Sequence, residues 1–135
     1  MFAHCNSLTS LDISNFDFSK ALTITKMVYN CTNLSKLNIQ KVKGENLSSM
    51  DEVFGYCKSL TSLDLTGFDT TSVISMTSMF ANSGLMKLDL TSFDTQKTKY
   101  FSNIFQNCKG LEIKVNKETC ANIINNLPNY VTIVE

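Results

Sequence analysis

A repeat of 25 or 26 residues runs through most of this chain and constrains its fold more than any other feature. The interval separates Leu8, Leu34, Leu60, Leu85 and Leu111, and other apolar columns keep the same register, among them Phe2, Val28, Phe54, Phe80 and Phe105. Repeats of this length are typical of arrays in which each unit buries its apolar side chains against its neighbours. The sequence therefore predicts an array of stacked units.

Each unit contains two hydrophobic periods. Residues 60–66 alternate between apolar and polar, which predicts a half-exposed strand. Residues 73–80 have apolar side chains at positions 73, 76, 79 and 80, a spacing that predicts a short helix. Asp69, Thr70 and Ser72 precede this segment and are residues that favour turns and helix N-caps. One strand and one short helix are therefore expected in each unit.

The two kinds of element predict the shape of the array. Neighbouring parallel strands lie about 4.8 Å apart, whereas packed helices need about 8–10 Å. We therefore expect an α/β repeat that forms a right-handed, curved solenoid, with parallel strands on the concave face and short helices on the convex face. The repeats are expected over residues 1–115, with units that begin at Leu8, Leu34, Leu60 and Leu85 and a truncated N-terminal helix at 1–7. Residues 116–135 are expected to form a C-terminal helix–strand cap, because helical spacing precedes Pro128 and a last strand follows it. The start within a unit favours a fragment of a longer array.

The polar positions of the predicted strands give the candidate binding surface. We expect the concave face to present Asp12, Lys36, Asn38, Ser62, Asp64, Thr66, Lys87, Asp89 and Thr91. Two interpretations of the Asp column stay open. Neighbouring carboxylates favour a cation or a basic partner, but a solvated ladder of hydrogen bonds with the nearby Ser and Thr hydroxyls also offsets their repulsion.

Composition argues against several classes of function. Twelve basic residues, all Lys, balance twelve acidic ones, which disfavours nucleic acid and anionic membranes as partners. No apolar run reaches the roughly 20 residues of a membrane helix, so we expect no direct membrane insertion of this segment. His4 is the single histidine and no Cys-x-x-Cys pair occurs, so neither a metal site nor a catalytic base is indicated. We expect no enzymatic activity, no catalytic residues and no cofactor.

The cysteines also follow the repeat. Cys5, Cys31, Cys57 and Cys108 occupy one column, in which Ser83 replaces Cys once. In a helix layer these positions would lie about 8–10 Å apart, beyond the ~7 Å that a disulfide tolerates. Free, buried thiols are expected, although a position nearer the strands would leave a disulfide open.

The segment 60–73, followed by Met76, Met79, Phe80 and the Cys column, resembles the BspA-like leucine-rich repeat family, also called DUF285. The resemblance covers roughly residues 1–115 and implies a leucine-rich-repeat solenoid. It also implies a cell-surface or secreted protein, with its signal or anchor outside this segment, that adheres to host extracellular or cell-surface proteins. The expected function is thus a non-enzymatic protein-binding module. The alternative is a passive structural spacer that displays another domain.

Overall fold

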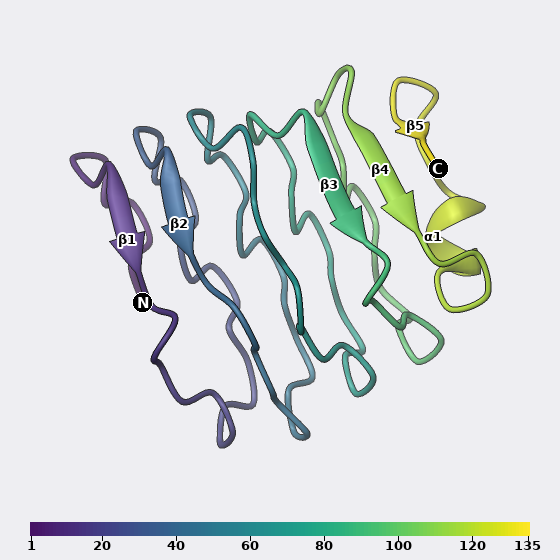
Figure 1. Ribbon diagram of the computed structural model, residues 1–135, viewed down its shortest axis with the longest axis horizontal. Coiled ribbons are helices and arrows are strands. Elements are labelled where there is room, and N and C mark those ends of the chain that lie inside the picture. Colours follow the sequence, from purple (N-terminus) through teal and green to yellow (C-terminus); the bar gives the residue numbers. More distant parts are fainter.

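The structure is a computed structural model that describes residues 1–135. Its strands are parallel and short, and they lie side by side in chain order (Figure 1). They are β1 (Ser10–Asp12), β2 (Lys36–Asn38), β3 (Lys87–Leu90), β4 (Glu112–Val115) and β5 (Thr132–Ile133), with one helix, α1 (Ala121–Ile124), before β5. β1 and β2 form one sheet, and β3, β4 and β5 form a second.

The predicted α/β leucine-rich-repeat solenoid, a curved arc with a layer of short convex helices, is wrong. The one α-helix has four residues and lies within 116–135, whereas residues 1–115 contain none. The segment 73–80 and the N-terminal segment 1–7, both predicted helical, consist of turns and irregular backbone. Most of the chain is outside regular elements, and the strands belong to two small sheets instead of one continuous concave sheet.

The sheets are interrupted at residues 60–66, where a strand was predicted. This segment runs between β2 and β3 in Figure 1 without forming a regular strand. Its alternation nevertheless persists, because Leu63 and Leu65 are buried while Asp64 and Thr66 are exposed. The pattern therefore predicted which side chains face the core, but not the pairing of the backbone.

The helical spacing was misleading because successive β-turns also return to the same side every three residues. In the second unit the Gly55 amide donates to the Glu52 carbonyl over 3.2 Å, the bond of such a turn. Alternate amides donate instead to the next unit, as Glu52 does to Thr77 over 2.9 Å and Phe54 does to Met79 over 2.9 Å. In a helix each interior amide donates to the carbonyl four residues earlier and is not free to donate to a neighbouring unit. Cross-unit hydrogen bonds therefore select turns over a helix here.

Left-handed residues make these turns possible. The φ angles lie between 53° and 61° at eight turn positions: Lys26, Asn30, Glu52, Tyr56, Ser78, Asn82, Asn103 and Asn107. Four of the eight are Asn, the non-glycine residue type that most readily accepts this conformation. The asparagines of the repeat thus indicate turns, whereas the apolar spacing alone suggested a helix.

The core lies between the strand side and the turn side of the chain and joins all units. It contains 34 buried apolar residues, among them the repeated leucines from Leu34 onward. Phe80 stacks on Phe54 at 5.5 Å and on Phe105 at 5.6 Å between ring centroids. The repeat thus places like side chains on one another, and each unit is buried by its neighbours.

Candidate functional site

The exposed side chains of the strands and of residues 62–66 form a surface that we call the strand face. β1 and β2 pair Ser10 with Lys36 and Asp12 with Asn38. β3 and β4 pair Lys87 with Glu112 and Asp89 with Lys114. The predicted columns therefore exist where strands form, and all nine predicted binding residues fall at exposed or half-buried positions: Asp12, Lys36, Asn38, Ser62, Asp64, Thr66, Lys87, Asp89 and Thr91.

Sequence reasoning missed the last members of these columns. Glu112 and Lys114 continue the lysine column and the aspartate column with the opposite charges. Glu112 lies 3.7 Å from Lys87 in an ion pair. The alternation after Leu111, in which Ile113 is buried and Lys114 is exposed, was the available signal.

Each aspartate of the column is held by the residue two positions after it. The Asp12 carboxylate accepts hydrogen bonds from the Ser14 hydroxyl at 2.6 Å and the Ser14 amide at 3.0 Å. Asp89 accepts from the Thr91 hydroxyl at 2.6 Å and the Thr91 amide at 2.9 Å. Donors stabilise the ionised form, and the hydroxyl and amide of the second residue lower the pKa of both carboxyls. These side chains are therefore ionised and held in one orientation.

The second carboxylate oxygen reaches across to another unit. The Asn38 amide group donates to Asp12 Oδ2 at 3.2 Å, and the Gln40 amide group donates to Asp64 Oδ2 at 3.0 Å. The Thr66 hydroxyl and amide are the main causes of the lowered pKa of Asp64. Asp64 is also close enough to Asp89 to oppose the lowering of the Asp89 pKa, while Lys114 assists it. Hydrogen bonds and Lys114 therefore offset the repulsion that the sequence predicted.

The strand face is hollowed from the first unit to the start of the fourth. An open depression of about 640 Å³ is lined by the strand face and its edges: Ser10, Leu11, Asp12, Ser35, Lys36, Leu37, Asn38, Gln40, Ser62, Leu63, Asp64 and Lys87. Lys36 and Lys87 lie in one column of this surface, and Asp12 and Asp64 lie in the next. The depression therefore presents both signs of charge to solvent.

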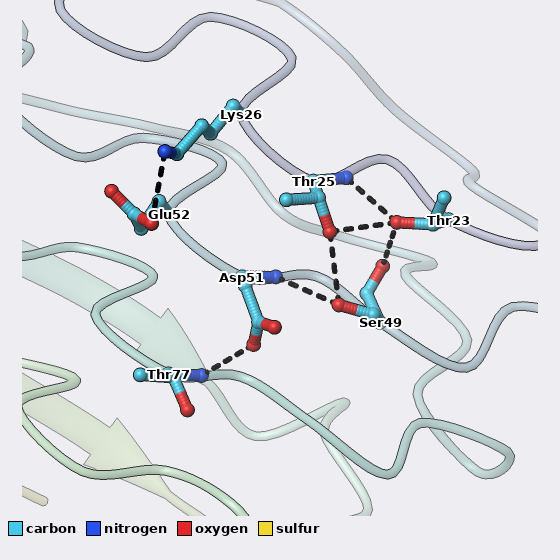
Figure 2. A network of polar contacts seen from close by, with 7 residues as sticks. All are labelled: Thr23, Thr25, Lys26, Ser49, Asp51, Glu52 and Thr77. Atoms are coloured by element: carbon cyan, nitrogen blue, oxygen red, sulfur yellow. Dashed lines mark hydrogen bonds and ion pairs between the residues drawn. The ribbon is translucent and has the colours of Figure 1, made fainter.

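A second polar network lies on the opposite, turn side of the chain, and sequence reasoning missed it (Figure 2). Asp51 accepts from the Thr77 amide at 2.8 Å and from the Ser75 hydroxyl. Thr25 and Ser49 share a hydrogen bond of 2.9 Å between hydroxyl oxygens. Ser, Thr or Asp recurs at equivalent positions of successive units, and this recurrence in the sequence could have indicated the network. These bonds join neighbouring units, so the network is a structural seam.

The cysteines form no disulfides, and the potential metal ligands do not cluster. All five cysteines are free; Cys31, Cys57 and Cys108 are buried as expected, but Cys5 is exposed, contrary to its column. The Cys57 thiol donates to the Val28 carbonyl at 3.1 Å, and burial raises its pKa to about 12. No group of three or more His, Cys, Asp or Glu side chains has the geometry of a metal site. No helix has the length and apolar character needed to cross a membrane.

Comparison with known proteins gives one match. A family model described as "Mycoplasma protein of unknown function, DUF285" matches residues 1–122. No curated protein and no solved structure is significantly similar to the chain. The match spans all of the repeats and the start of the C-terminal segment, and the chain therefore belongs to the DUF285 family.

Proposed function

We propose that this chain is a non-enzymatic protein-binding module whose strand face contacts another protein at a cell surface. The observation that carries the proposal is the fixed row of charged side chains on this face. Asp12, Asp64 and Asp89 are each tied to the residue two positions on, and they lie beside the Lys36 and Lys87 column.

Fixed charges favour recognition for two reasons. A side chain that is already ordered loses less conformational entropy when it binds. A pattern of both signs also selects partners, because like charges placed together across an interface are penalised. The proposed partner is a host extracellular or cell-surface protein with a complementary pattern, which agrees with the resemblance of the repeat to BspA-like surface adhesins.

The binding experiment compares two variants against a panel of purified extracellular-matrix and host surface proteins. The first variant combines Asp64→Lys, Lys87→Glu and Asp89→Lys on the strand face. Glu118→Lys is the matched control, because it changes the net charge by the same amount at an exposed position outside the strand face. The triple variant is expected to weaken binding about tenfold or more, since several interfacial charges reverse at once. Unchanged binding of the triple variant to every identified partner would overturn the proposal.

A passive spacer is the second candidate, and the stacking of the units favours it. Backbone hydrogen bonds join successive units, so each added unit would extend the array by about one strand spacing, ~4.8 Å. A spacer predicts no saturable binding to the panel, and it also predicts that the strand-face variant behaves like wild type in every assay.

The location of the parent protein has its own test. Intact source cells are treated with protease, and the released peptides are identified by mass spectrometry. Release of peptides from this chain without lysis supports a surface module. Protection of the chain until lysis contradicts the proposed location and removes adhesion as its role.

A further inference from the structure

On the turn side, each unit donates amides to the carbonyls of the unit that follows. In the third unit the donors are Met76, Ser78, Phe80 and Asn82. Their acceptors are the carbonyls of Tyr100, Ser102, Ile104 and Gln106, at 2.7 to 3.0 Å. The first and second units make the same kind of bond, as in Val28 to Val53 at 3.2 Å and Phe54 to Met79 at 2.9 Å.

The fourth unit repeats the donors without a fifth turn segment to accept from them. By register the donors are the amides of Phe101, Asn103, Phe105 and Asn107. The Asn107 amide donates to the Tyr130 hydroxyl at 3.1 Å, so a side chain of the C-terminal segment replaces the missing carbonyl. The amides of Phe101, Asn103 and Phe105 have no hydrogen-bond partner in the chain.

An unpaired amide is costly where the residue is buried. Phe105 is only 1% exposed, and a buried donor without an acceptor loses its hydrogen bond to water without a replacement. The three amides thus form an edge that favours any segment able to supply carbonyls. We call residues 101–107 the open turn edge.

A hollow lies against the open turn edge. It measures about 460 Å³, within the range of peptide and ligand pockets, and residues 99–106 line it together with Asn126, Pro128 and Tyr130. Tyr100 is 60% exposed at its rim. The hollow therefore combines unpaired donors with apolar rings and leaves space for a short segment of backbone.

We propose that the open turn edge binds an extended peptide segment of another protein by backbone addition. Carbonyls of alternate residues of the peptide accept from the amides of Phe101, Asn103 and Phe105. This mode of recognition gains affinity from main-chain hydrogen bonds and selectivity from the side chains that alternate along the peptide. Uncharged peptides with an apolar residue against Phe101 and Pro128 suit the hollow, because no charged side chain except Lys99 lines it. This surface is separate from the strand face.

The first experiment selects peptides of about twelve residues from a random displayed library, with the whole chain as bait, and titrates the selected peptide by nuclear magnetic resonance. Hydrogen exchange is then measured at single amides. Where exchange requires dissociation of the peptide, exchange at Phe101, Asn103 and Phe105 is expected to slow about 100-fold at a free peptide concentration of 100 times Kd. The amide of Ser78, which is already bonded to Ser102, serves as the internal reference.

The second experiment changes the number of free donors. Tyr130→Phe removes the hydroxyl that occupies the Asn107 amide, so this amide should become a fourth site of peptide-dependent protection. Tyr56→Phe is the matched control, because it removes a tyrosine hydroxyl in the second unit, outside the lining of the hollow. A library that yields no binding peptide would overturn the proposal. So would peptides that shift strand-face amides but leave exchange at the open turn edge unchanged.

Discussion

Replacement of Ser78 by Gly and by Ala separates the turn structure from the helix that the apolar spacing predicted. Ser78 lies in the third unit with φ at 54°, and its hydroxyl makes no hydrogen bond in the chain. The hydrogen bond from its amide to the Ser102 carbonyl joins backbone atoms, so both replacements retain it. The two variants therefore differ in backbone preference and in little else.

The left-handed conformation at position 78 determines which of the two variants is expected to be more stable. This conformation costs a residue with a Cβ about 1–2 kcal/mol, whereas glycine adopts it freely. Glycine loses about 0.5–1 kcal/mol more backbone entropy on folding, which leaves the Gly variant about 0.5–1 kcal/mol more stable than the Ala variant. In a helix the order is reversed, because Gly is about 0.8–1.0 kcal/mol worse than Ala. The stability difference between the Gly and Ala variants thus differs by about 1.3–2 kcal/mol between the turn structure and the helix.

Urea unfolding followed by circular dichroism measures this difference in the free energy of unfolding. Ser102 provides the matched control site, because it is exposed on the turn side and does not have a positive φ angle. There the Ala variant should be the more stable of the pair. An Ala variant at position 78 that is more stable than the Gly variant would refute the reasoning.

Three further predictions test the core, the thiols and the strand face. Phe80→Ala should lower the free energy of unfolding by about 3–5 kcal/mol in urea unfolding, because it empties a fully buried site and removes two ring stacks. A thiol reagent at pH 8 should label Cys5 in the folded protein but Cys57 only after unfolding, by mass spectrometry, because the Cys57 pKa of about 12 keeps it protonated. Stability from the buried Cys57 thiol is complete below its unfolded pKa near 8.5 and is lost as the pH rises toward 12. Thr91→Val should raise the pKa of Asp89 toward its usual value in a magnetic-resonance titration, and should reduce the stability lost as the pH falls below about 4.

Each prediction has a contrary outcome. A Phe80→Ala variant as stable as wild type would mean that the stacked rings do not support the array. Rapid labelling of Cys57 in the folded protein would contradict its burial. An unchanged Asp89 pKa in the Thr91→Val variant would mean that the hydroxyl does not hold the carboxylate.

The candidate site was partly readable from the sequence. The alternation around Leu63 and Leu88 identified the residues that face solvent, and Asp12, Asp64 and Asp89 are all exposed. The carboxylate partners were less predictable. The Ser and Thr donors two residues after each aspartate could be read from the sequence. The contacts of Asn38 and Gln40 with the aspartates could not, because they depend on how neighbouring units align. The open turn edge was not visible either, since the unpaired amides of Phe101, Asn103 and Phe105 are recognised only from the cross-unit hydrogen bonds that the preceding units make.

The sequence by itself determined the repeat, the buried columns and the polar side of each unit, because these depend on which side chains leave water. The tertiary structure alone decided whether the second half of each unit forms a helix or turns. Apolar residues three and four positions apart suit both, so hydrophobicity could not distinguish them. The decision came from the backbone: alternate amides bond to carbonyls about 25 residues away, and only units stacked in register bring those carbonyls within reach.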